Sequence, residues 1–175
     1  MNMRRVAAEL NVSPRLLYHR VRDKNELADL LSDAIIAQNW PDLSSPDWET
    51  RLRNVAAASA QAYADFPGVP ASILAHTVNQ LRQPSALKLR AAVLQALHDS
   101  GLSEENVEIS FLQFSVILLG SLVLKENLAH PEASSGFAID PARVERSIAM
   151  GLDLLIFGIR RLAHGDAGQT LSSQR

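Results

Sequence analysis

The chain has 175 residues, of which 47% are hydrophobic, and its 17 Lys and Arg nearly balance its 19 Asp and Glu. This composition can bury a hydrophobic core, and the length suits a small head with one larger helical domain. Cysteine is absent, which excludes disulfides and thiol chemistry. The N-terminus lacks an apolar signal region and the longest apolar run, residues 111–124, is too short to span a bilayer, so we expect a soluble cytoplasmic protein with no membrane partner.

The first segment has the pattern of two short helices joined by a tight turn. Asn11 stands at the turn, and Asn tolerates the left-handed backbone that such a turn needs. Ser13 offers a side-chain oxygen as N-cap, and Pro14 occupies the first helical position, where a missing N–H costs nothing. This order predicts a helix-turn-helix. The apolar residues expected to face inward from the pair are Val6, Ala7, Leu10, Leu17 and Val21.

The outer face of the second helix mixes cations with an aromatic hydroxyl. A recognition helix places its N-terminal residues on base edges in the major groove. Arg15 suits guanine O6 and N7, and Leu16 suits a thymine methyl. Further along, Tyr18, His19, Arg20 and Lys24 are expected on phosphates, which positions the protein without specifying sequence. Arg4, Arg5, Ser13 and Pro14 complete the predicted DNA-contacting set.

Basic charge is concentrated at this end of the chain. Residues 1–26 hold six Lys and Arg against three Asp and Glu, whereas residues 27–175 hold eleven against sixteen. The alternative is an ordinary helix pair with a solvated basic face, but segregated charge favours DNA binding. Asp23 with Glu26 resembles a capping box, so we expect Lys24 and free backbone N–H groups at a helix N-terminus to form an anion site.

These residues resemble the DNA-binding domain of the tetracycline-repressor (TetR) family of bacterial transcriptional regulators. The match runs from Arg4 to Leu31, and its most specific parts are Leu17-Tyr18 and the Val21, Lys24 and Leu27 spacing. Members usually carry a His two residues after the Tyr, where this chain has Arg20. The family's domain begins with a long helix before the pair. Only Met1–Met3 precede it here, so we expect further residues upstream, which would cover the apolar face of the pair.

Beyond the head, every segment has helical periodicity and none alternates like a strand, which predicts an all-α fold. Gly101 is placed as a C-cap, and Asp140-Pro141 begins the last helix. The predicted helices are residues 24–39, 47–66, 70–81, 85–100, 103–129 and 141–164, with a mobile loop at 130–136. The predicted organisation is a head at 1–39, a linker at 40–46, an effector-binding and dimerisation domain at 47–164, and a disordered tail at 165–175.

Residues 111–124 and 148–162 are apolar nearly all round. A helix that is hydrophobic on every side must be buried on every side. In a chain of this size one flank would then face a partner, which favours a four-helix bundle between two subunits. A thick core within one monomer is the alternative. The predicted interface residues are Gly120, Ser121, Leu124, Gly151, Leu155 and Gly158.

Residues 47–163 also resemble the C-terminal domain of the same family. The matches are Asp47-Trp48 with Leu52, Gly101-Leu102-Ser103, and residues 151–155 with Gly158. The resemblance implies a homodimer with an effector pocket in each subunit, although it does not imply tetracycline. By position, Val55 stands where that repressor has a drug-contacting Asn, and Ile73 where it has a magnesium-binding His.

The pocket is predicted from polar residues embedded in apolar helix faces, a mixture typical of small-molecule sites. Each has a plainer alternative as a hydrogen-bonded core group. The polar candidates are Ser59, Tyr63, His76, Gln113 and Ser115, and the expected walls are Leu94, Phe111, Phe114, Leu118 and Leu122.

The five histidines are scattered and form no zinc-binding spacing, and no phosphate loop or nucleophile elbow is present. We therefore expect no enzyme activity, metal or cofactor. The hypothesis is a homodimeric regulator, a repressor released from a palindromic double-stranded DNA operator by a small-molecule effector. The alternative is a helical ligand-binding or dimerisation protein that has lost DNA binding with its first helix.

Overall fold

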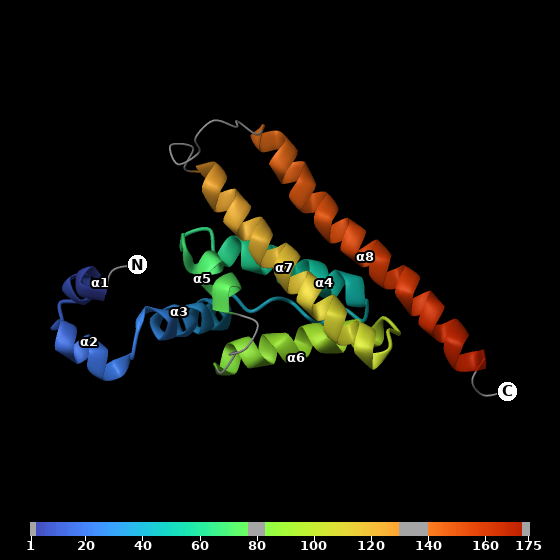
Figure 1. Cartoon of the computed structure of the whole chain (residues 1–175), viewed down its shortest axis with the longest axis horizontal. Coiled ribbons are helices and arrows are strands. Elements are labelled where there is room, and N and C mark those ends of the chain that lie inside the picture. Colours follow the sequence, from blue (N-terminus) through green and yellow to red (C-terminus); the bar gives the residue numbers. More distant parts are fainter. Residues whose placement is uncertain (1–2, 77–82, 130–139, 173–175) are drawn as a thin grey trace.

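The computed structural model describes residues 3–76, 83–129 and 140–172, and these residues form helices without strands. Figure 1 shows a small pair of helices set apart at one end, a connecting helix, and a larger helical body. The predicted all-α fold is confirmed. The helices are α1 (Met3–Glu9), α2 (Pro14–Arg20), α3 (Lys24–Gln38), α4 (Trp48–Ala62), α5 (Val69–His76), α6 (Pro84–Asp99), α7 (Glu104–Ala129) and α8 (Pro141–Ser172).

The pair α1 and α2 forms through local signals. Asn11 has a φ of 52°, the left-handed conformation that turns the chain between the helices. The Ser13 hydroxyl then accepts a hydrogen bond from the backbone N–H of Leu16 at 3.1 Å and caps α2. Their small shared core contains Met3, Ala7, Leu17 and Val21.

Two details of this pair differ from a simple inward-facing apolar pattern. Leu10 is 60% exposed, although its N–H still donates to the Val6 carbonyl at 3.0 Å in the last turn of α1. Val21 is buried as predicted, but it lies after the last residue of α2 in extended backbone.

Helix α3 leads from the small pair into the larger body (Figure 1). Its N-terminus is capped by Asp23, whose Oδ1 accepts hydrogen bonds from the N–H groups of Asn25 at 2.8 Å and Glu26 at 3.0 Å. Further along, α3 packs against α4, α5 and α6. This one helix therefore takes part in both the head and the larger body.

The larger body has a core where α4, α6, α7 and α8 meet. Its fully buried centre contains Leu52, Leu97, Val107 and Ile159. A second cluster joins Ile35 of α3 to residues of α4, α5 and α7. In Figure 1, α8 runs beside α7, and these two helices form the largest helix contact.

Helix α7 is, among the described residues, the one helix long and apolar enough to cross a membrane by length and composition alone. The apolar run at residues 111–124, which is too short to span a bilayer, is only the central part of this helix. In this fold α7 packs against α5, α6 and α8 and contributes the buried Val107, Phe114 and Leu119 to the two clusters. Its apolar character therefore has a role in the core of the helical body.

Several predicted boundaries differ from the structure. Helix α4 ends at Ala62 and the turn that follows uses Gly68 at a φ of 82°, so the helix is shorter than predicted. Helix α8 continues to Ser172, although disorder was expected from Gly165; no proline interrupts this stretch, and helix propagation past isolated glycines costs only about 1 kcal/mol each. The predicted loop at 130–136 lies outside the described residues.

The predicted linker at 40–46 is held against the body. Pro41 is buried, Leu43 packs on the main core, and Asn54 Nδ2 donates a hydrogen bond to the Asp42 carbonyl at 2.8 Å. At its end Asp47 caps α4, accepting from the Thr50 N–H at 2.9 Å, which confirms the predicted helix start.

Candidate DNA-binding face and ligand cavity

The outer face of α2 carries the residues predicted to read DNA. Leu17 is the one buried side chain of this helix and anchors it on α1. With Leu17 facing inward, Leu16 and Tyr18 are about half exposed. The structure leaves every residue of the predicted set exposed: Arg4, Arg5, Ser13, Pro14, Arg15, Leu16, Tyr18, His19, Arg20 and Lys24.

The predicted anion site at the start of α3 needs a correction. Asp23 already accepts the N–H groups of Asn25 and Glu26, and Glu26 reaches back to the Arg22 N–H at 2.5 Å. The expected free backbone donors of Asn25 and Glu26 are therefore occupied. A phosphate contact here depends on the exposed side chain of Lys24.

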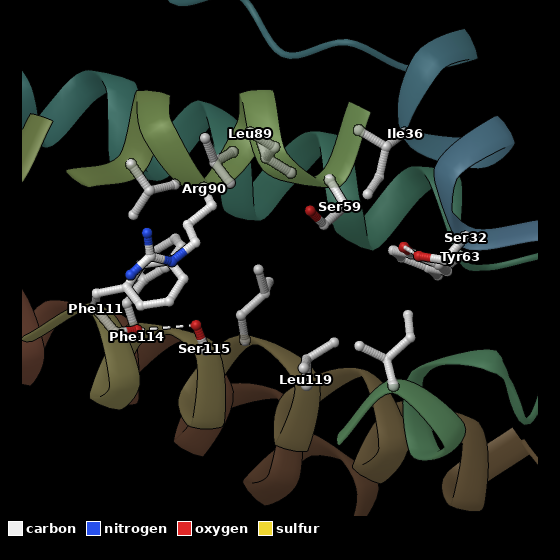
Figure 2. A pocket seen from close by; sticks show the side chains of 15 residues that line it. Ser32, Ile36, Ser59, Tyr63, Leu89, Arg90, Phe111, Phe114, Ser115 and Leu119 are labelled. Carbon is white, nitrogen blue, oxygen red and sulfur yellow. Dashed lines mark hydrogen bonds between the residues drawn. The ribbon is translucent and has the colours of Figure 1, made fainter. Parts of the chain in front are cut away.

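A cavity of about 670 Å³, counted to its open mouth, lies between α4, α6 and α7, and α3 and α5 close one end of it. Figure 2 shows Ser59, Leu89 and Arg90 across from Phe111, Ser115 and Leu119 of α7. Sites for small molecules have such a largely apolar wall with a few polar groups. The lining residues are Ser32, Ile36, Val55, Ser59, Tyr63, Ile73, Ala86, Leu89, Arg90, Val93, Phe111, Phe114, Ser115, Leu118 and Leu119.

The cavity brings together six of the ten residues predicted to form a pocket: Ser59, Tyr63, Phe111, Phe114, Ser115 and Leu118. Gln113 is exposed, because one helical residue is rotated about 100° from the next and Phe114 takes the inward position. Leu94 packs on the main core, and Leu122 lines neighbouring hollows. The side chain of His76 lies outside the described residues.

Sequence reasoning missed the α6 and α3 sides of the cavity. Ala86, Leu89, Arg90 and Val93 have the spacing of one helix face, so the periodicity of α6 contained the signal. Ser32 and Ile36 were assigned to the head, and no local pattern indicates that α3 reaches the cavity. Val55 and Ile73, which stand in place of the two tetracycline-site residues named above, also line the cavity.

Hydroxyl groups line the cavity at the end formed by Ser32 and Tyr63 and at two further positions along its length. The Ser32 and Tyr63 hydroxyls are hydrogen-bonded at 2.6 Å, joining α3 to α4. Burial raises the pKa of the Tyr63 hydroxyl, so this group stays neutral at physiological pH. Ser115 donates to the Phe111 carbonyl at 2.9 Å, and Figure 2 shows Ser59 between the two ends.

A second connection ties α3 to the cavity wall. Asp33 accepts hydrogen bonds from the N–H groups of Ser85 at 2.7 Å and Ala86 at 2.9 Å, and its other oxygen meets the Ser85 hydroxyl at 3.2 Å. The N-cap residue of α6, Gln83, makes no side-chain cap bond. A residue of α3 therefore caps α6 and connects the two helices directly.

We expect Asp33→Ala to lower the free energy of unfolding by about 1–2 kcal/mol, because the first N–H groups of α6 lose their cap. Urea denaturation at fixed protein concentration measures the change. Asp65→Ala is the matched control, since it removes the same charge from an exposed position after α4. Equal losses in the two variants would contradict the capping role.

The outward side of α7 and α8 is unusually apolar, and large exposed apolar patches mark interaction surfaces. We call it the α7–α8 apolar face, and it consists of Ile109, Leu112, Val116, Leu124, Met150, Leu154, Phe157 and Leu162, each at least 46% exposed.

Of the predicted interface residues, Leu124 belongs to the α7–α8 apolar face. A Cβ placed on Gly120 or Gly158 would meet nothing within 4 Å, so both positions are open in the protomer. The other three residues take part in packing within the protomer. Ser121 lines a hollow beside α4, a Cβ on Gly151 would meet Ile117 at 3.6 Å, and Leu155 packs on the main core.

Among the described residues, no cluster of three or more His, Cys, Asp or Glu side chains is arranged to hold a metal ion.

Comparison with protein-family models finds no match. A curated relative, the HTH-type transcriptional repressor DrrR1 of Streptomyces coeruleorubidus, is 29% identical over 126 residues, which are 69% of this chain and 44% of that protein. The chain thus matches less than half the length of this relative.

Solved structures are similar along nearly the whole chain. BioQ of Mycobacterium smegmatis has a TM-score of 0.74 at 22% identity, covering 92% of this chain and 87% of that one. BioQ with its double-stranded DNA operator gives 0.70 at 21%, covering 91% and 86%. The Streptomyces coelicolor TetR family protein ActR, in complex with (S)-DNPA, gives 0.72 at 16%, covering 93% and 88%. The chain therefore has the fold of TetR-family proteins, as its sequence resemblance predicted.

Proposed function

We propose that this chain is a homodimeric transcriptional regulator, a repressor that leaves its operator when a small molecule fills the cavity. The observation that carries the proposal is the path of α3. This helix follows the exposed α2 directly, and its Ser32 and Ile36 belong to the cavity wall. The name of DrrR1 as a repressor, the operator complex of BioQ and the ligand complex of ActR support both halves of the proposal.

On DNA, α2 lies in the major groove with its first turn on base edges. Arg15 donates to guanine and Leu16 contacts a thymine methyl, while the cations further along neutralise phosphates. Two heads related by a two-fold axis then read a palindromic operator, with half-sites about one helical turn apart.

The effector acts through differential binding to two arrangements of the dimer. A ligand between α6 and α7 pushes on the wall that contains Ser32 and Ile36. Because Asp33 also holds α3 to α6, the displacement passes along α3 toward the DNA-reading pair. The spacing of the two heads then no longer fits the operator.

The dimer forms through the α7–α8 apolar face. Two helices from each subunit pack as a four-helix bundle, which removes this surface from water. We also propose that the protein works in the cytoplasm and has no catalytic activity, since its sites suit binding.

The test begins with selection of operator sequences from random DNA by the full chain, followed by fluorescence anisotropy titrations. Arg15→Ala should cost about 1–3 kcal/mol and relax preference at one base pair per half-site. Lys24→Ala should weaken binding to all sequences alike and reduce the salt dependence, because it removes a phosphate contact.

Lys88→Ala is the matched control, since Lys88 is an exposed cation on α6, outside the DNA-reading pair α1 and α2. If Arg15→Ala and Lys88→Ala bind the selected DNA equally, the assignment of α2 as the reading helix is wrong. If selection enriches no sequence although the cavity binds a probe, the alternative of a ligand-binding protein without DNA binding is correct.

A further inference from the structure

The ligand cavity is charged at one end only. Among its described lining residues, Arg90 alone carries a charge at neutral pH; the others are apolar or bear hydroxyl groups. Figure 2 shows the Arg90 side chain reaching toward Phe111, at the end of the cavity opposite Ser32 and Tyr63. No carboxylate lines the described wall, so a cationic ligand group would find a like charge and no partner.

The Arg90 guanidinium is held in place by a ring of the cavity wall and by a carboxylate outside the cavity. It lies 5.0 Å above the centre of the Phe111 ring, and Nη2 contacts the two carboxylate oxygens of Glu108 at 3.1 and 3.2 Å. Both contacts use one nitrogen, so the Nε and Nη1 donors make no hydrogen bond to the described residues. A guanidinium that is stacked on a ring and fixed on one side is prepared to bind an anion bidentately.

We propose that the effector is an organic anion with an apolar body of aromatic size. Its acidic group pairs with Arg90, and its body lies between Leu89 of α6 and Leu118 of α7. The hydroxyls of Ser59, midway along the cavity, and of Tyr63, at the far end, serve polar atoms of the ligand. This inference rests on the proposed function, because it names the class of molecule that occupies the same cavity.

Two fluorescent probes measure separately how the acidic group and the apolar body contribute to binding. Anilinonaphthalene sulfonate carries an anionic sulfonate on an arylaminonaphthalene, and N-phenylnaphthylamine has the same body without the charge. Both are titrated into the full chain and into Arg90→Met, which keeps an unbranched apolar stem over Phe111. The matched control Lys88→Met removes the same charge from the exposed side of α6.

We expect Arg90→Met to weaken binding of the sulfonate probe about tenfold, the loss of one charge-assisted pair. The uncharged probe should bind this variant as it binds the original chain. Lys88→Met should change neither probe. Glu108→Gln should tighten binding of the sulfonate probe, because it removes the carboxylate that competes for Arg90.

Filling the cavity with Ser59→Trp should abolish binding of both probes, with Ser115→Phe as the equivalent change on the opposite wall if the first lowers helix content. If both filled variants bind the two probes unchanged, the cavity is not the ligand site and that half of the proposed function fails. If filling abolishes both probes while Arg90→Met and Lys88→Met bind the sulfonate equally, the cavity stands and the anion assignment is overturned.

Discussion

Phe157→Asp should convert the protein from dimer to monomer, with the dissociation constant of the dimer raised about 100-fold or more. Phe157 is 67% exposed at the centre of the α8 part of the α7–α8 apolar face. Burying this face in an obligate dimer implies an interface above roughly 2,000 Å². Two-fold symmetry would place two new carboxylates in it, without the hydrogen bonds that a buried charge needs. Sedimentation velocity at micromolar concentration measures the change.

Leu87→Asp supplies the matched control for this experiment. Leu87 is 45% exposed on α6, so the variant removes a comparable apolar surface and adds the same charge outside the face. It should remain a dimer. Gly158→Arg should behave like Phe157→Asp, because the position is open within the protomer and blocked only by a partner. A stable monomer formed by the unmodified chain at micromolar concentration would disprove the dimer.

Leu97→Ala should lower the free energy of unfolding by about 2–5 kcal/mol, the range for a large side chain removed from a core. Leu97 has no exposed surface and lies in the cluster shared by α4, α6, α7 and α8. The space left by the leucine side chain is surrounded by residues of several helices. These helices cannot all move inward to fill it. Urea denaturation followed by circular dichroism gives the value, at one protein concentration because the proposed dimer would make stability depend on concentration.

On the same helix, Leu87→Ala should cost less than about 0.5 kcal/mol, as exposed substitutions do. Comparable losses at the two positions would mean that this cluster is not the centre of the fold.

Helix starts were predictable because their causes lie within a few residues. Ser13, Asp23 and Asp47 each cap the helix that they were expected to begin. The end of α8 was not predictable in the same way, since a glycine penalty competes there with continuation of a long helix. The sequence contains both signals and does not show which prevails.

The cavity was only half predictable, for a different physical reason. Residues 111–124 of α7 are apolar nearly all round, so their pattern does not identify the inward face; packing against α5, α6 and α8 decides that Phe114 is buried and Gln113 exposed. The contribution of α3 depends on contacts between residues far apart in the chain, such as Ser32 with Tyr63. Local periodicity contains no information on such pairs.

Because α3 belongs to both the head and the larger body, it limits how parts of proteins with this fold can be exchanged. A chimera that exchanges residues 1–39 for the head of another regulator would import foreign side chains at Ser32, Asp33 and Ile36. Under the proposed function, such a chimera would acquire a new operator and, unintentionally, an altered effector response. A junction inside α3, between Leu27 and Ser32, would exchange the DNA-reading surface and retain the cavity wall. The boundary between the residues for DNA specificity and those for ligand specificity therefore lies within α3. It does not lie in the segment that connects α3 to α4.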